Sequence, residues 1–215
     1  MAPSTRGDGS GTGVRRKHDP RWASYHPIGD VKRIAQETSV VSNNYFRGTE
    51  GYVPGDFRQA VDLDDGSSNF HVYNNLCVDM AISCREGDYR TVENNIIVRP
   101  VVPTGFHCGF DGNHDRFRRN IVVTAGDTYY LNGAPITTPW LEEIDRNLFW
   151  TPQRTWNYRP VISVRVVGGD VRKYTLAEWQ NLGYDAHSVV GDPMFSDPDK
   201  GDYRVRPESP ALKLG

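Results

Sequence analysis

The sequence lacks several features that would assign it quickly to a class of protein. It has no run of the roughly 18 apolar residues that a membrane-spanning helix needs. Its 25 basic and 27 acidic residues nearly balance, so neither nucleic acid nor an anionic membrane is an expected partner. Residues 1–20 contain no apolar segment of the kind found in signal peptides, and we interpret them as a disordered lead-in.

Cysteine is also scarce. The chain has three cysteines, Cys77, Cys84 and Cys108, and their odd number and spacing argue against a disulfide framework or a zinc site. We expect buried free thiols, because free cysteine is among the most buried residue types. The sequence therefore predicts no metal site built on cysteine.

A helical period is missing before residue 174, and a short repeat takes its place. Each repeat has a short run of residues, an asparagine and then mostly apolar residues. The five segments are "SVVSNNYF", "FHVYNNLC", "RTVENNII", "RFRRNIVV" and "EIDRNLFW", with asparagines Asn44, Asn75, Asn95, Asn120 and Asn147. The asparagines are 31, 20, 25 and 27 residues apart, and this variation excludes propeller blades and helical repeats.

Repeats of variable length are typical of a solenoid whose insertions lie in the turns between short strands. The strand segments are rich in β-branched residues, and several alternate apolar with polar residues. We therefore predict an all-β fold, a parallel β-helix of about five or six coils over residues 21–160. An asparagine at the same turn of every coil tolerates left-handed backbone, and its amide can donate and accept along a ladder.

Residues 161–215 form the C-terminal part of the predicted domain. The segment 161–174 indicates a hairpin with "GGD" at its turn. Thr175 and Glu178 form a capping-box pattern, which predicts one short helix over about 176–182 that ends before Gly183. The proline-punctuated tail that follows is expected to be extended and to lie over the final coils, where it would protect the sheet edge.

The asparagine repeat, the acidic "DLDDGSSN" and the ending "DPMFSDPDKGDYRV…SPALKLG" together resemble the right-handed parallel β-helix proteins of bacteria. The ending is similar to the closing segment of secreted β-helix glycoside hydrolases, including a group with α-fucosidase and xylanase activities. The resemblance covers roughly residues 20–215. It implies a polysaccharide or oligosaccharide partner, an extracellular or periplasmic location and a monomer. Such enzymes usually have more coils upstream, so we expect this chain to be the C-terminal part of a longer protein.

Three aspartates in "VDLDDG" are the first candidates for chemistry. In a strand, Asp62 and Asp64 point to one face while Val61 and Leu63 point to the other, which we expect to be the core. We predict Asp64 and Asp65 as catalytic residues and Asp62 as a substrate-binding residue, because close carboxylates can raise one another's pKa. The alternative is an ordinary polar turn. Calcium is a further alternative, although the full ligand pattern of a calcium loop is absent.

The next coil brings a cation and an acid towards these aspartates. If Ile82 and Cys84 point into the core, Arg85 lies outward beside Asp64, and Glu86 follows it. We predict that Arg85 and Glu86 bind substrate. The alternative is a surface salt bridge, which contributes about 0–1 kcal/mol.

The third coil, "TGFHCGFDGNHDRF", contributes a histidine and another acid. Cys108 follows Cys84 by 24 residues, about one coil, so we expect the two to stack in the core and His107 to lie outward above the second coil. We predict His107 as a substrate-binding residue and Asp111 as the partner of the Asp64 region. Two coils separate them, about 9.6 Å at the spacing of adjacent strands. A structural role for the histidine is the alternative.

Three functions remain open. Paired carboxylates favour a glycoside hydrolase, which needs a proton donor and a nucleophile or base about 5–9.5 Å apart and no cofactor. An outward arginine and histidine would also suit a polysaccharide lyase, which needs a base and a group that neutralises a uronate. The third hypothesis is a non-catalytic carbohydrate-binding or structural module.

Overall fold

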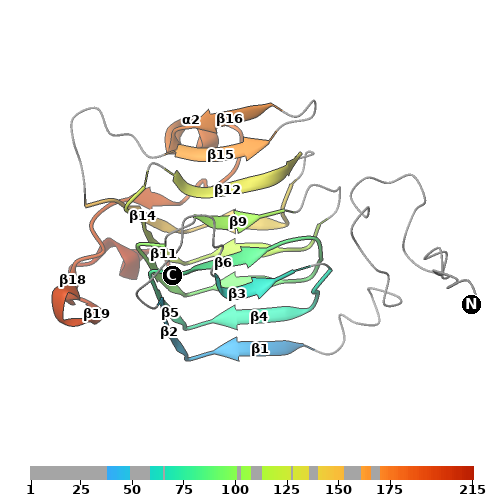
Figure 1. Cartoon of the computed structure of the whole chain (residues 1–215). Coiled ribbons are helices and arrows are strands. Elements are labelled where there is room, and N and C mark those ends of the chain that lie inside the picture. Colours follow the sequence, from blue (N-terminus) through green and yellow to red (C-terminus); the bar gives the residue numbers. More distant parts are fainter. Residues whose placement is uncertain are drawn as a thin grey trace, which may run out of the picture.

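Three parallel β-sheets make up most of the protein in the computed structural model (Figure 1). The structure describes residues 38–48, 59–64, 66–100, 103–107, 113–126, 128–135, 140–152, 161–165 and 170–215. Within these ranges the chain is all-β with a single α-helix, so the predicted fold class is confirmed at this level.

Each sheet stacks strands that lie far apart in the sequence. Sheet A contains β1 (Ser39–Ser42), β4 (Phe70–Tyr73), β7 (Thr91–Glu93), β10 (Arg116–Arg118) and β13 (Glu143–Asp145). Sheet B contains β2 (Tyr45–Arg47), β5 (Leu76–Val78), β8 (Ile96–Val98), β11 (Ile121–Val123), β14 (Leu148–Trp150) and β17 (Val189–Val190). Sheet C contains β3 (Gln59–Leu63), β6 (Ala81–Cys84), β9 (Thr104–Phe106), β12 (Thr128–Pro135), β15 (Val161–Arg165) and β16 (Val171–Tyr174).

The chain visits sheets A, B and C in the same order from β1 to β15. Each return to a sheet adds a strand parallel to the one before. The register places equivalent residues of successive strands next to one another. In sheet A the inward position is Val41, Val72, Val92, Phe117 and Ile144. Apolar side chains therefore stack on apolar side chains inside, while the neighbouring strand positions point outward.

The five repeat asparagines form a continuous ladder beside the turn from sheet A to sheet B, as predicted. The side-chain amide of Asn75 donates from Nδ2 to Oδ1 of Asn95 at 3.0 Å, and Asn95 does the same to Asn120 at 3.0 Å. Asn44 donates to Asn75 at 3.0 Å, and Asn120 donates to Asn147 at 3.3 Å. Each Oδ1 also accepts the backbone N–H of the preceding ladder asparagine.

The left-handed backbone of this turn belongs to the residue before each ladder asparagine. These residues are Asn43, Asn74, Asn94, Arg119 and Arg146, with φ between 52° and 58°. The sequence suggested that the ladder asparagines would carry the left-handed conformation, and this is wrong. Asparagine is required at the ladder position for its amide, and its short side chain also suits the left-handed position before it.

The core enclosed by the sheets changes character along the stack. Towards β1 it is aliphatic, with Val72, Ile97 and Cys77 fully buried. Towards the C-terminal end it becomes aromatic, and most ring pairs pack edge-on or tilted among Phe106, Phe117, Tyr130, Phe149, Trp140 and Trp179. Aromatic side chains bury the most apolar area each, so this end contributes strongly to stability.

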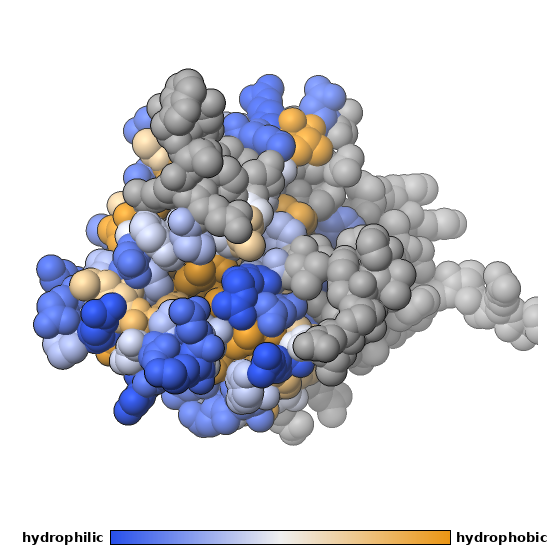
Figure 2. Space-filling model, turned by 60° about the vertical axis from the view of Figure 1, so that its left-hand side comes forward, coloured by the Kyte–Doolittle hydropathy of each residue, from blue (hydrophilic) through white to orange (hydrophobic). Residues whose placement is uncertain are grey.

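The outer face of sheet B is apolar and is covered by the C-terminal tail (Figure 1). Hairpin strands β18 (Phe195–Asp197) and β19 (Asp202–Val205) place Phe195 and Tyr203 against Val78, Val98 and Ile121. The tail thus covers sheet B from β5 onwards, which is more of the stack than the predicted final coils. Figure 2 looks towards this side, where hydrophilic side chains surround small hydrophobic patches.

The C-terminal elements close the far end of the stack. β16 pairs antiparallel with β15, so the predicted hairpin is confirmed, although residues 166–169 of its turn lie outside the described residues. Helix α2 (Leu176–Asn181) starts with the predicted capping box between Thr175 and Glu178. Gly183 follows with a φ of 94°, which suits glycine. Two short 3₁₀ helices, η2 (Pro198–Lys200) and η3 (Pro210–Lys213), complete the tail.

Cys77 and Cys84 are free thiols in the core, as predicted. Burial raises the pKa of each thiol to about 12, which keeps both protonated and unreactive at neutral pH. Cys108 lies outside the described residues.

Candidate functional site

The candidate site lies where the chain leaves sheet C on its way to sheet A. We call the segments 64–69, 85–90 and 107–115 the C–A connections; they follow β3, β6 and β9. The backbone hydrogen bonding of sheet C continues one residue into the C–A connections. Arg85 N–H donates to Leu63 O, and His107 N–H donates to Cys84 O. Asp64, Arg85 and His107 therefore start the three connections at one lateral position.

Four of the predicted residues form a connected chain of contacts. Nη1 of Arg85 lies 2.6 Å from Oδ1 of Asp64, and its Nε lies 3.7 Å from Oε2 of Glu86. The other Glu86 oxygen, Oε1, lies 2.7 Å from Nδ1 of His107. Glu86 is only 7% exposed, whereas the side chains of Asp64, Arg85 and His107 are about two fifths exposed, at 42%, 41% and 40%. A buried carboxylate thus links a surface arginine to a surface histidine.

The predicted strand alternation is confirmed around these residues. Val61 and Leu63 are buried while Asp62 is exposed and lies opposite Ser83. Asp62 is on the same outer face as Asp64, two residues earlier. Asp65 and Asp111, the other two predicted catalytic residues, lie outside the described residues.

The predicted stacking of Cys108 on Cys84 is wrong. Phe106 is the residue opposite Cys84, and it is buried among the aromatic core residues. His107 still points outward next to Arg85, because residues 106 and 108 have the same parity in a strand. The extra length of this repeat lies after β9, because the third connection is three residues longer than the second.

A second carboxylate–histidine pair in the same connections was not predicted. Asp88 Oδ1 accepts the backbone N–H of His114 at 2.6 Å, and Oδ2 lies 3.0 Å from its Nδ1. The Tyr89 ring stacks on the His114 ring with centroids 4.2 Å apart. Burial raises the pKa of Asp88, and the hydrogen bonds from His114 oppose that effect.

Beneath these groups lies a buried ion pair. Nε of Arg90 donates to both oxygens of Asp115 at 3.1 Å, and its Nη2 lies 2.5 Å from Oδ2. Arg90 is fully buried and also donates to the carbonyl oxygens of Leu63, at the end of β3, and of Ser67, in the first connection. The buried Arg90–Asp115 pair therefore joins all three connections on their inner side. A charge pair this buried needs such complete hydrogen bonding.

The sequence contained a signal for these missed residues. Arg90 and Asp115 each stand five residues before a ladder asparagine, Asn95 and Asn120, so stacking places opposite charges together. Tyr89 and His114 stand six residues before the same asparagines, and their rings stack. Counting back from the ladder would have found both contacts.

Gly87 separates Glu86 from Asp88 for a steric reason. A Cβ at this position would collide with the carbonyl oxygen of Ser67. The second connection therefore packs closely against the first, while Glu86 and Asp88 on either side of Gly87 contact histidines of the third.

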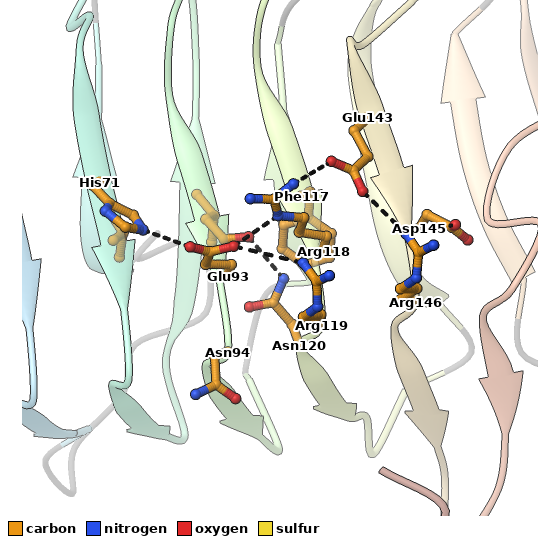
Figure 3. Close-up of polar contacts among 12 residues, drawn as sticks. His71, Glu93, Asn94, Phe117, Arg118, Arg119, Asn120, Glu143, Asp145 and Arg146 are labelled. Carbon is orange, nitrogen blue, oxygen red and sulfur yellow. Dashed lines mark hydrogen bonds and ion pairs between the residues drawn. The ribbon is translucent and has the colours of Figure 1, made fainter. Parts of the chain in front are cut away.

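The outer face of sheet A carries a second charged arrangement, which we call the charge strip (Figure 3). It runs across four strands and into the segment after α2, and its members in order are His71, Glu93, Arg118, Glu143, Arg146, Asp145 and His187. Contacts between neighbours range from 2.6 to 3.5 Å.

Two carboxylates of the charge strip have lowered pKa values. Burial raises the pKa of Glu93, but hydrogen bonds from Arg118 and His71 outweigh it. Burial likewise raises the pKa of Asp145, and hydrogen bonds from His187 outweigh it. Since every member has at least one oppositely charged or hydrogen-bonding partner within the strip, its main effect is to tie strands of sheet A together.

No group of three or more His, Cys, Asp or Glu side chains within the described ranges is arranged to hold a metal ion. The acidic cluster for which calcium was considered includes Asp65, whose position the structure does not describe. In the described part of the chain, no helix is long and apolar enough to cross a membrane.

Comparisons with known proteins give no further identification. No family model, curated protein or solved structure matches this chain.

Proposed function

We propose that the three sheets are the walls of a right-handed parallel β-helix and that the protein acts on carbohydrate. The fixed order of sheets, the in-register parallel pairing and the asparagine ladder support a solenoid, because each coil repeats the contacts of the last. The resemblance of the C-terminal segment to β-helix glycoside hydrolases supports the carbohydrate substrate.

The reaction that we propose is hydrolysis of a glycosidic bond in a polysaccharide. The observation that carries this proposal is that one guanidinium, that of Arg85, contacts both Asp64 and Glu86. Two carboxylates that share one guanidinium are separated by no more than the two contacts and the width of that group. This is within the separation of up to about 9.5 Å that glycosidases use.

In this mechanism Asp64, the more exposed carboxylate, is the nucleophile or the base that activates water. Glu86 and His107 together supply the proton to the leaving oxygen, since Nδ1 of the histidine is held by Glu86 and Nε2 remains to face substrate. Arg85 and Asp62 bind sugar hydroxyl groups. Asp65 and Asp111 remain catalytic candidates on the sequence argument alone.

A polysaccharide lyase is the second candidate, and the His107–Glu86 contact favours it. A neutral histidine oriented through Nδ1 can abstract a proton with Nε2, and Arg85 can neutralise the carboxylate of a uronate. The reaction would transfer the proton α to that carboxylate to Nε2 of His107 and expel the glycosidic oxygen, which takes a proton from water, and this leaves an unsaturated sugar.

The test is to incubate the protein with neutral and uronate-containing polysaccharides and to measure two products. Release of reducing ends without ultraviolet absorbance indicates hydrolysis, whereas absorbance from an unsaturated product indicates a lyase. Binding without either product would support the non-catalytic alternative and contradict both enzymatic proposals.

Substitutions then locate the site. We expect Asp64→Asn and Glu86→Gln each to lower kcat by about 10²–10⁴-fold, the usual contribution of a catalytic acid or base. Glu208→Gln, at an exposed tail position, is the matched control and should leave kcat unchanged. Asp111→Asn tests the remaining predicted partner. If all three aspartate and glutamate variants kept full activity, the site assignment would be wrong.

The resemblance also leads us to propose a monomer that works outside the cell or in the periplasm. Size-exclusion chromatography with light scattering tests the first part, and fractionation of cells that produce the full-length protein tests the second.

A further inference from the structure

A cavity on a different face of the molecule lies where the tail crosses sheet B. Its volume is about 230 Å³, and it opens between the ends of β2 and β5 and the turn that joins β18 to β19. The lining residues are Tyr45, Arg47, Val78, Arg99, Pro198, Asp199, Lys200, Gly201 and Tyr203. None of them belongs to the C–A connections.

The lining contains three cations and one carboxylate, and the cations differ in how they are compensated. Arg99 is held by Asp79, at 3.2 Å, and by the hydroxyl of Tyr203, at 3.4 Å. Lys200 pairs with Asp197 at 2.9 Å. The guanidinium of Arg47 has no ion pair or hydrogen bond in the part of the chain that the structure describes. Arg47 is therefore the cation that remains available to an anion.

Arg99 can act as a second hydrogen-bond donor to an anion, because it is charged and fixed in position. Burial alone would lower its pKa, but the contacts with Tyr203 and Asp79 raise it, so the guanidinium stays charged. Its left-handed backbone, with a φ of 49°, and its two side-chain partners fix its position. A fixed, charged guanidinium binds carboxylate or sulfate oxygens at a low cost in side-chain entropy.

The remaining lining fits one sugar ring. Tyr45 is 58% exposed, which is unusual for an aromatic side chain beside an apolar sheet face, and it offers a flat surface next to Arg47. A cavity of about 230 Å³ is smaller than the roughly 300–1,000 Å³ of most ligand pockets, so a single ring is the largest unit it holds.

We propose that this cavity is a second saccharide subsite, which binds one ring that carries a carboxylate or sulfate group. The anion contacts Arg47 and Arg99, and the ring lies against Tyr45. The choice of a sugar rests on the proposed carbohydrate function, whereas the site itself is separate from the C–A connections. It would hold an acidic chain on the sheet B side while cleavage takes place on the sheet C side.

The test measures binding to the whole protein by calorimetry with three probes: glucuronate, glucose and inorganic sulfate. We expect glucuronate to bind more tightly than either of the others, and added salt to weaken it. Arg47→Gln should weaken glucuronate binding about tenfold, as expected for the loss of one charge-assisted contact. Arg172→Gln, which removes an arginine from β16 that is also exposed, is the matched control and should have no effect.

Each other outcome overturns a defined part of the proposal. Equal binding of glucose and glucuronate, or no binding at all, excludes an acidic-sugar site. Equal binding of sulfate and glucuronate excludes the ring contact with Tyr45. An unchanged affinity in Arg47→Gln places any binding elsewhere. Because no turnover is measured, failure here leaves the Asp64 and Glu86 cleavage assays as an independent test of the proposed enzyme activity.

Discussion

The turns from sheet A to sheet B (the A–B turns) and the C–A connections both join a strand of one sheet to a strand of the next. They differ in length and in the side chains that they carry. Each A–B turn has two residues, a left-handed one and a ladder asparagine, in all five repeats. The C–A connections have six residues at 64–69 and at 85–90 but nine at 107–115. The A–B turns are therefore uniform, whereas the C–A connections vary in length and in their side chains.

The difference shows which positions of this fold can vary in sequence and so carry functional side chains. At the A–B turn, each ladder amide hydrogen-bonds to the amide of the next repeat, so a substitution in one repeat leaves donors or acceptors unpaired in two. At the C–A connections, carboxylates, histidines and arginines from three successive connections meet at a partly exposed surface. The buried Arg90–Asp115 pair shows that the variable side is nevertheless fixed from below.

The largest expected effect tests that buried pair. Arg90→Met should lower the free energy of unfolding by about 3–5 kcal/mol, because it leaves the Asp115 carboxylate buried without its partner. Urea denaturation followed by circular dichroism measures the change. The double variant Arg90→Met/Asp115→Leu should regain much of the loss. If the single variant were as stable as the parent, the pair would not fix the connections.

The centre of the ladder should be nearly as sensitive. Asn95→Leu removes three donated hydrogen bonds and leaves the Asn75 amide without its acceptor, so we expect a loss of about 3 kcal/mol. Asn44→Leu, at the exposed end of the ladder, should cost about 1 kcal/mol or less. Equal losses at the two positions would contradict the cooperative ladder.

The charge strip on sheet A should have a smaller, pH-dependent effect. At neutral pH, Arg118→Gln should cost about 1 kcal/mol, because its contacts with Glu93 and Glu143 are only partly screened from solvent. The lowered pKa of Glu93 means that its contribution is complete above the unfolded value of about 4.3 and is lost as the pH falls through the folded value.

Acid denaturation of the parent and of Glu93→Gln separates this contribution from those of other groups. The parent should lose more stability than Glu93→Gln between neutral pH and the acid range. Buried Asp88 and Asp185 have raised pKa values and change stability in the opposite direction, but they do so equally in both proteins. Parallel curves for the two proteins would show that the Glu93 contacts do not contribute.

The smallest effect concerns the left-handed position of the A–B turn. Arg119 has a φ of 54° where three other repeats have asparagine, and its ion pair with Glu93 is long, at 4.0 Å. Arg119→Asn should raise the free energy of unfolding by about 0.5 kcal/mol, since asparagine adopts this conformation at lower cost. Arg118→Asn, one residue earlier in a strand, is the control and should lower stability. A loss in Arg119→Asn would mean that the arginine side chain matters more than its backbone.

Much of the fold could be predicted because it repeats. Five asparagines beside apolar residues were enough to locate the ladder, and the capping box located α2. The tail was predicted less well, since its position depends on the apolar outer face of sheet B. That face includes Ile96 and Ile121, which the sequence alone does not distinguish from core residues.

The candidate site was predictable in part. Strand alternation placed Asp64, Arg85 and His107 on one side, and the structure connects them through Glu86. Alternation gives the face of a side chain but not the exact register between coils of different length. This is why the sequence placed Cys108 where Phe106 lies. The contact between Asp88 and His114 was missed because both residues lie in connections outside the alternating strands.

The asparagine ladder also produces a net dipole along the stack. In all five ladder asparagines the side-chain amide donates one hydrogen bond towards the C-terminal end of the stack and its oxygen faces the other end, so the amide dipoles add. The positive end of this row meets the buried carboxylate of Asp185, which accepts the last N–H, from Asn147, at 3.1 Å. Tyr130 and Ser188 donate to the same carboxylate. Burial raises the pKa of Asp185, and the hydrogen bonds from Ser188, Tyr130 and Asn147 at the positive end of the row oppose that rise, as donors do at the start of a helix.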